Sequence, residues 1–328
     1  MTARRMTPFR LAGVLLVFTA LLTALGVAVG SMGWEPPWGA SAVPGAIVWD
    51  IRLPRTLGAW FAGALLGLSG AIAQGLFRNP LADPFLLGSA SGATLGVAVL
   101  LAWLGVSPAA AGIGAQLGMT GFAFAGAAGA VLITLTLAQG VQHTLRLLLA
   151  GVVVGVVLGA LASLVALWSP DILRAMQTFM LGTTSFLGWS SVAMTAVALA
   201  VALVLALPLS RALDALSLGE TTALSLGVPL PVVRGVLVVA LALSTGAAVA
   251  HVGLVAFVGL AAPHLVRTAL KPAHRSLLAL SAITGGALLL AADVLARWLM
   301  APQELPVGIL TAVLGGGYLL VLMHRRSS

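Results

Sequence analysis

The sequence predicts an all-α, polytopic membrane protein with about ten transmembrane helices, organised as a single domain over residues 1–328. Of these residues 60% are hydrophobic and only 7% are charged, whereas soluble domains carry about 25% charged residues. The mean hydropathy is +1.14. Many apolar runs approach the roughly 20 residues that a membrane-spanning helix needs, and the alternating pattern of a membrane β-barrel is absent. A water-soluble globule is therefore excluded.

Ten apolar stretches are predicted to cross the membrane. We place them at residues 11–31, 53–76, 87–104, 116–138, 145–167, 190–207, 232–250, 252–267, 276–300 and 307–323. The first begins after a basic segment without a clear cleavage site, so we expect it to be retained as a span. The eighth is short and follows the seventh almost directly, around His251.

Two of these stretches carry glycines at three- or four-residue spacing. They are Gly63, Gly67 and Gly70 in the second stretch and Gly151, Gly155 and Gly159 in the fifth. Small residues let helix backbones approach closely in a membrane. The pattern favours packing inside the bundle, with a dimer interface as the alternative.

Positive charge is distributed unevenly between the loops. If both termini are cytoplasmic, twelve of the 16 Lys and Arg residues lie on the cytoplasmic side. The four on the outer side are Arg52, Arg55, Arg174 and Arg297. This is the positive-inside pattern, and it requires an even number of spans. The net charge of +8 is explained by these loops, so we expect membrane lipid and no nucleic acid as a partner.

The side chains needed for enzymatic or ion-driven chemistry form no recognisable pattern. The chain has no cysteine, and its five histidines lack metal-ligand spacing, so no metal site and no catalytic residue are predicted. The single lysine, Lys271, follows Leu270, whereas a nucleotide-binding P-loop has Gly directly before its Lys. A series of intramembrane carboxylates, expected of a proton-coupled pump, is also missing. Energy for transport is therefore expected from another protein; a stand-alone secondary transporter is the rival hypothesis.

A polar segment, DALSLGETTALSLGV at 214–228, lies in a cytoplasmic loop that spans 211–228. Glu220 begins a short run predicted to be helical as far as Leu226, and its carboxylate suits a helix N-terminus. Gly227 is placed to end that helix. Leucines combined with capping signals favour a surface that contacts another protein, with an ordinary polar loop as the alternative.

Five motifs carry more specific information. They are RLPR at 52–55, RNPLADPFLLG at 78–88, LGETTALSLGV at 218–228, GLAAPHLVR at 259–267 and ELPVG at 304–308. In this order and approximate spacing they closely resemble the FecCD-type permeases, the membrane subunits of importers for iron–siderophore complexes, haem and cobalamin. The resemblance extends from about residue 51 to residue 318.

The resemblance implies a type II ABC importer permease in the bacterial inner membrane that pairs with a second copy of itself. Two cytoplasmic ATPase subunits would bind ATP and Mg and drive alternating access, and a periplasmic binding protein would deliver the cargo. This chain would be no enzyme and would bind no cofactor. The expected cargo is an iron chelate, either a siderophore complex or haem, with cobalamin as the alternative.

The resemblance also assigns roles to residues. The segment that seats in the ATPase would comprise Leu218, Gly219, Glu220, Ala223, Leu226 and Gly227. Arg52, Arg55 and Arg297 would dock acidic residues of the binding protein. Local pairing is the alternative, because Asp50 is close to Arg52 and Asp293 precedes Arg297 by one helical turn.

The translocation pathway is expected to involve five residues, which are Asn79, Leu81, Thr144, Leu145 and Arg174. The first four match positions that gate the pathway in the cobalamin member of the family, although Leu145 stands where a small polar residue is expected. Asn79 precedes a proline, so a helix-ending turn is the alternative there. Arg174 would meet carboxylates of a siderophore or of haem, or else belong to a short outer helix that lines the entrance.

Overall fold

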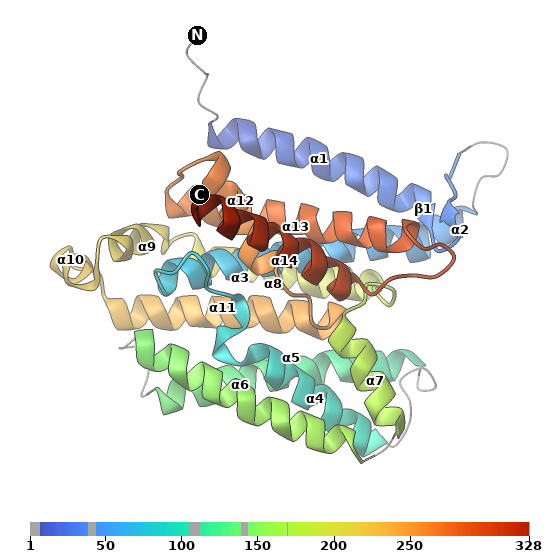
Figure 1. Ribbon diagram of the computed structural model, residues 1–328, viewed down its shortest axis with the longest axis horizontal. Coiled ribbons are helices and arrows are strands. Elements are labelled where there is room, and N and C mark those ends of the chain that lie inside the picture. Colours follow the sequence, from blue (N-terminus) through green and yellow to red (C-terminus); the bar gives the residue numbers. More distant parts are fainter. Residues whose placement is uncertain (1–6, 39–43, 105–111, 139–143, 169, 328) are drawn as a thin grey trace, which may run out of the picture.

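The protein is a bundle of helices that run along one common direction, with short elements at both ends (Figure 1). The computed structural model describes residues 7–38, 44–104, 112–138, 144–168 and 170–327. Within these ranges, a helix occupies each of the ten predicted stretches. The ten are α1 (Pro8–Ala28), α3 (Leu53–Leu76), α4 (Ser89–Leu104), α5 (Gly112–Leu137), α6 (Thr144–Ala166), α8 (Trp189–Ala206), α11 (Leu230–Val252), α12 (Val258–Ala269), α13 (His274–Trp298) and α14 (Val307–Ser327).

Most of these helices are long and apolar enough to cross a bilayer. Seven meet that standard within the described residues, while α4 and the apolar part of α14 are shorter. α12 has only 12 residues. The prediction of a mostly helical membrane bundle is confirmed.

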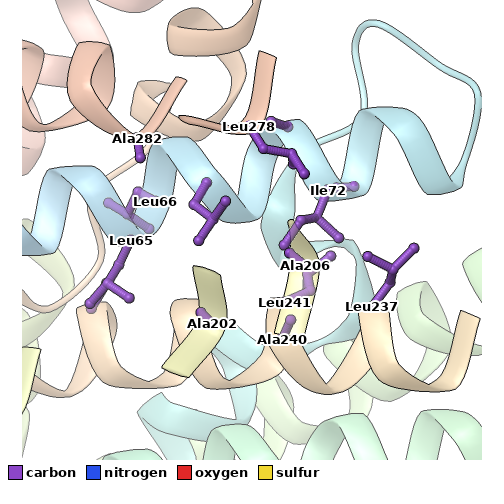
Figure 2. Close-up of a cluster of buried hydrophobic side chains, with 14 of the residues drawn as sticks. Leu65, Leu66, Ile72, Ala202, Ala206, Leu237, Ala240, Leu241, Leu278 and Ala282 are labelled. Atoms are coloured by element: carbon purple, nitrogen blue, oxygen red, sulfur yellow. The ribbon is translucent and has the colours of Figure 1, made fainter. Parts of the chain in front are cut away.

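α3 occupies the centre of the bundle. It contacts α13 on one side and α8, α11 and α12 on others. Figure 2 shows Leu65, Leu66 and Ile72 of α3 between Leu278 of α13 and Leu241 of α11. Each of these five side chains is at most 1% exposed. Because α3 is surrounded by other helices rather than by lipid, its small residues serve internal packing.

The glycines of α3 allow the closest of these approaches. A Cβ added to Gly63 or Gly67 would overlap backbone atoms of α13, at Gly285 and Ser281. One added to Gly70 would overlap the backbone of Gly259 in α12. The expected internal packing of this glycine series is thereby confirmed.

The glycines of α6 divide between two situations. A Cβ on Gly151 would overlap the carbonyl oxygen of Leu86, in the 3-10 helix η2 (Pro84–Leu87). Gly155 and Gly159 have looser neighbours, with the Ser91 hydroxyl 3.7 Å from the added Cβ in each case. The α6 glycines therefore face η2 and the start of α4.

Short elements close the two ends of the bundle. At one end lie the paired strands β1 (Val29–Gly30) and β2 (Gly33–Trp34), α2 (Gly45–Ile47), the π-helical turn η1 (Val48–Arg52) and α7 (Pro170–Leu181). At the other end lie α9 (Ser210–Ser217) and α10 (Glu220–Ser225) (Figure 1). We call these the β1 end and the α10 end.

The break between the seventh and eighth stretches lies later than predicted. α11 continues through His251 to Val252, and α12 begins only at Val258. Gly253 has φ +69° and Phe257 has φ +68°, so the chain turns sharply between the two helices. The prediction of a break at His251 and a span from residue 252 was wrong, because a run of apolar residues masks the change in backbone conformation.

Candidate functional site

The residues predicted to be functional gather at opposite ends of the bundle. The polar loop at 211–228, which we call the contact segment, forms most of α9 and all of α10 at the α10 end. The turn after α3 lies at the same end. The outer arginines lie at the β1 end, around η1, the start of α3 and the end of α13. Each end contains a network of ion pairs.

α10 is a compact helical turn bounded by two glycines. Gly219 precedes it with φ +117° and Gly227 follows it with φ +77°. The amide of Val228 donates to the Ala223 carbonyl at 3.1 Å, and the amide of Gly227 donates to the Leu224 carbonyl at 2.9 Å. This is a Schellman ending, so Gly227 terminates the helix as predicted.

The segment offers an apolar surface to its surroundings. Leu218, Leu224 and Leu226 are 68%, 57% and 63% exposed, whereas Ala223 is fully buried. Ala223 packs toward the bundle, and the leucines surround it on the outside. Exposed leucines at a membrane-protein end, outside the spanning helices, are typical of an interaction site.

Glu220 connects α10 to two other elements. Its Oε1 lies 2.5 Å from Nη2 of Arg234 in the first turns of α11. The same oxygen lies 3.7 Å from Nη2 of Arg78, in the turn that follows α3. The Arg234 side chain is 4% exposed, so the first pair is anchored in the bundle. The second pair reaches a turn at the surface.

α9 has its own attachment to the bundle. Asp214 accepts hydrogen bonds at Oδ1 from the backbone amide of His274 at 3.0 Å and from its ring nitrogen Nδ1 at 2.7 Å. His274 is the first residue of α13. The contact segment is therefore fastened at α9 to α13 and at α10 to α11 and to the turn after α3.

The turn after α3 is built by the motif at 78–88. The amide of Asn79 donates to the Gln74 carbonyl and that of Arg78 donates to the Gly75 carbonyl, at 3.2 and 3.4 Å. This again is a Schellman ending, but the left-handed position is occupied by Arg78, with φ +50°. Asn79 Oδ1 then accepts from the amide of Leu81 at 2.9 Å. The helix-ending role of Asn79-Pro80 that the sequence allowed is present.

The C-terminal end of α3 is also tied to α12. The Gln74 side chain donates to the Leu260 carbonyl at 3.3 Å and accepts a short hydrogen bond from Arg267. α3 therefore ends in a fixed position, while the turn beyond it is held by Arg78.

Of the predicted gate residues, Leu81 and Leu145 present apolar side chains at the surface, 53% and 70% exposed. Thr144 begins α6, and its side chain lies outside the described residues. A gating role for these four positions stays a prediction.

At the β1 end, Arg55, Asp293 and Arg297 form a buried cluster. Asp293 Oδ1 accepts from Arg55 Nε at 3.1 Å, and Oδ2 accepts from Arg297 Nη2 at 2.5 Å. Thr184 also donates its hydroxyl to Asp293, at 2.6 Å. Arg297, 1% exposed, further donates to the carbonyls of Gly26 and Val29. The local i,i+4 pairing of Asp293 with Arg297 is confirmed.

Glu304 extends this cluster toward the surface. Its carboxylate accepts from Arg55 at 3.0 Å, from Ser31 at 2.6 Å and from Ser185 at 2.9 Å. Burial by itself would raise the pKa of Glu304, but the Arg55 guanidinium and the two hydroxyls lower that pKa to about 2. Glu304 is therefore ionised at neutral pH and acts as a second counter-ion for Arg55.

Arg52 pairs differently from the local alternative. Its Nη2 lies 2.5 Å from the carboxylate of Glu35, and its Nη1 donates to the carbonyls of Val27 and Glu35. The alternative of local pairing with Asp50 is not what the structure has, because the Arg52 guanidinium extends to Glu35 and Val27 beside the β1–β2 pair. Arg52, Arg55 and Arg297 are 5%, 7% and 1% exposed, so all three guanidinium groups are engaged within the chain. Docking by them stays a prediction.

Arg174 stands apart from this cluster. It lies on α7, its side chain is 79% exposed, and Nη1 is 3.4 Å from Asp171 one turn earlier. Met176 beside it is buried and Met180 is 54% exposed. α7 is a short helix at the β1 end. That it lines an entrance on the outer side, and that Arg174 contacts cargo, both stay predictions.

Sequence reasoning missed the partners that complete both networks. No partner was predicted for Glu35, Glu304 or Asp214, and none was predicted for Arg78 or Arg234. Their partners belong to other segments of the chain; Arg55 and Glu304 are 249 positions apart in the sequence. The one available signal was the position of Arg78 and Glu304 inside recognised motifs.

Comparison with known proteins identifies the family. A model of the FecCD transport family matches residues 12–325. The vitamin B12 import system permease protein BtuC of Salmonella typhi is 40% identical over 305 residues, which cover 92% of this chain and 91% of that protein. A metal-chelate-type ABC transporter solved in an inward-facing conformation has a TM-score of 0.82 and 28% identity, covering 97% of this chain and 99% of that one.

A second solved structure, PsaBC of Streptococcus pneumoniae in complex with Fab, shares the fold at a TM-score of 0.55 and 18% identity, covering 80% of this chain and 89% of that one. The predicted fold of an ABC importer permease is confirmed by these likenesses. The chain belongs to the FecCD transport family.

Proposed function

We propose that this chain is the permease of an ATP-driven importer for a bulky metal chelate, with cobalamin as the first cargo to test. The observation that carries the proposal is the α9–α10 unit, which presents Leu218, Leu224 and Leu226 outward and is fastened by Glu220 to the turn carrying the proposed gate. A surface for a partner and the proposed gate would thereby be linked within one chain.

Energy enters at the α10 end. The ATPase expected from the family would cover the three leucines, and burying a leucine contributes about 1.5–3 kcal/mol. ATP and Mg would be bound by that partner, because Lys271 follows Leu270 and no P-loop surrounds it. Alternating access of the pathway would follow from movement of α9 and α10.

The α10 end would face the cytoplasm, together with both termini, in a bacterial inner membrane. The uneven distribution of Lys and Arg supports this orientation. A second copy of the chain would pack against α6, whose residues Leu149, Val152, Val153 and Val156 are all more than half exposed. The pathway would then lie between the two copies.

The β1 end would receive the binding protein. Arg52, Arg55 and Arg297 supply positive charge there, but each is already engaged within the chain. An incoming carboxylate would therefore take the place of Glu35 beside Arg52 or of Glu304 beside Arg55. Exchange between acids costs less than exposing an unpaired buried charge.

The cargo follows from the relatives and from α7. The sequence favoured an iron chelate on the strength of Arg174, but that guanidinium already has Asp171 as a partner. The 40% identity to vitamin B12 permeases favours cobalamin, with haem and ferric siderophores as the alternatives. Asn79, Leu81, Thr144 and Leu145 would form the inner gate through which the cargo leaves.

Reconstitution tests the proposal. The permease, its ATPase and its binding protein are placed in proteoliposomes, and uptake of cyanocobalamin, haem and a ferric siderophore is measured with and without ATP. We expect ATP-dependent uptake of cobalamin, which disappears when the ATPase carries a substituted P-loop lysine. Uptake driven by an ion gradient without ATP would establish the rival class, and ATP-dependent uptake of another chelate would correct the cargo alone.

A further inference from the structure

Arg78 occupies a backbone conformation that its residue type disfavours. In the Schellman ending of α3 it holds the left-handed position, with φ +50°, where glycine is the usual residue. For a residue with a Cβ this conformation is unfavourable, because the Cβ comes too close to the following carbonyl oxygen. A strained position of this kind points to a role for the side chain.

The stability that Arg78 gains does not offset this cost. Its guanidinium pairs with Glu220 at 3.7 Å, and the two side chains are 42% and 34% exposed. Exposed ion pairs contribute little to folding stability, because water screens the charges. Glycine at position 78 would therefore be at least as stable, so folding stability does not explain the arginine.

The placement of Arg78 offers an explanation. Glu220 begins α10, the helix that is proposed to meet the ATPase, and its carboxylate touches both Arg234 and Arg78. Arg234 is buried in the bundle, so that pair fixes Glu220 to α11. Arg78 carries the other contact across to the turn after α3.

That turn is short and internally bonded. Asn79 Oδ1 accepts from the amide of Leu81, and the Asn79 carbonyl accepts from the amide of Ala82 at 3.0 Å. Arg78 is adjacent to Asn79 in the chain, and these hydrogen bonds connect Asn79 to Leu81 and Ala82. A force on the Arg78 side chain that moved its backbone would therefore move Asn79 and Leu81 with it.

We propose that Arg78 is the positioning residue that transmits movement of α10 to the inner gate, through its ion pair with Glu220. The proposal rests on the proposed function, in which α10 meets the ATPase and the turn at 79–81 lies at the gate. In this arrangement the exposed leucines bind the partner, and Glu220 works inside the chain.

Three substitutions separate the charge from the backbone strain. Arg78→Gly removes both, Arg78→Gln removes the charge and keeps the strain, and Arg78→Lys keeps both. In the reconstituted importer we expect Arg78→Gly and Arg78→Gln to lower the cargo imported per ATP hydrolysed by about 10-fold, a typical coupling between two sites. Arg78→Lys should stay within about 2-fold of the wild type, because the ammonium group restores the pair with Glu220.

A reporter at the turn gives a second readout. Because the chain has no cysteine, Leu81→Cys introduces a single thiol whose labelling by a maleimide is compared with and without ATP and vanadate. With Arg78 present, the labelling rate should depend on nucleotide; in the Arg78→Gly background that dependence should be lost. A purely structural role of Arg78 would leave the dependence intact in every folded variant.

The possible results are distinct. Equal cargo per ATP in Arg78→Gly and wild type overturns the inference alone, because the charge would then not be needed. A defect in Arg78→Gln that Arg78→Gly does not share also overturns it, because the backbone strain left without its ion pair would then be the cause. Absence of ATP-driven uptake by the wild type overturns the proposed function and this inference with it.

Discussion

Arg55, Asp293 and Arg297 place two positive charges around one carboxylate that is completely shielded from solvent. Moving a charge out of water costs several kcal/mol, and only close, well-bonded partners compensate for it. The side chain of Asp293 accepts from both guanidinium groups and from Thr184. The cluster is therefore sensitive to loss of its single central acid.

Asp293→Asn tests this dependence. The amide keeps the size of the side chain but leaves Arg55 and Arg297 with less negative charge, so we expect a loss of about 3–5 kcal/mol of unfolding free energy. Thermal unfolding of the purified permease in detergent measures it. The matched control is Asp171→Asn, because Asp171 and Arg174 are 66% and 79% exposed, and the change there should be negligible. Equal melting temperatures for the two variants would contradict the assignment.

Single residues also show what sequence alone could predict. The pairing of Asp293 with Arg297 was predictable because both lie on one helix at i,i+4 spacing. The pairing of Arg52 with Glu35 was not, since it depends on how η1 and β2 bring two segments together. Side-chain partners within a helix follow from spacing, whereas partners on different elements require the packing to be known.

Among the elements, α3 determines how tightly the bundle is packed. Its glycines bring it against α13 and α12 without room for a methyl group. Most helices were predictable because an apolar run of sufficient length has few alternatives in a membrane. The start of α12 was not predictable, because Phe257 takes a left-handed conformation inside a continuous apolar sequence.

Gly67→Ala tests the close contact. The added methyl group would overlap the carbonyl oxygen of Ser281 and approach the Cα of Gly285, and these backbone atoms cannot rotate away. We expect a loss of about 1–3 kcal/mol, the usual cost of overpacking, seen as a lower melting temperature in detergent. Gly13→Ala in α1 is the control, since a Cβ there has no neighbour within 4 Å. A stable Gly67→Ala protein would mean that α3 and α13 are further apart.

For the whole molecule, each end combines ion pairs with exposed side chains. At the α10 end, exposed leucines lie on a segment held by ion pairs, while at the β1 end Arg52, Arg55 and Arg297 are buried in ion pairs. The sequence identified both regions through their motifs. It did not show that Glu220 faces Arg234 and Arg78, because helix order within the bundle decides which charges meet.

Leu224→Asp tests the role of the α10 end in assembly. Replacing an exposed leucine by an acid removes apolar burial worth about 1.5–3 kcal/mol and adds a charge that the complex would have to desolvate. We expect at least about a 10-fold weaker affinity for the ATPase, measured by titration of the labelled ATPase against permease in detergent. Leu224→Met keeps the apolar surface and should bind like the wild type. Unchanged binding of Leu224→Asp would move the contact away from α10.

The central position of α3 couples movements at the two ends of the bundle in time. The helix has 24 residues and is therefore about 36 Å long, with Arg55 in its first turn and Gln74 in its last. Tightly packed helices are hardly compressible, so a shift of one end along the axis reaches the other end as part of the same motion. Movements at the two ends of α3 should then share one relaxation rate. In the proposed importer, a change at the β1 end and a change at the α10 end would be kinetically inseparable.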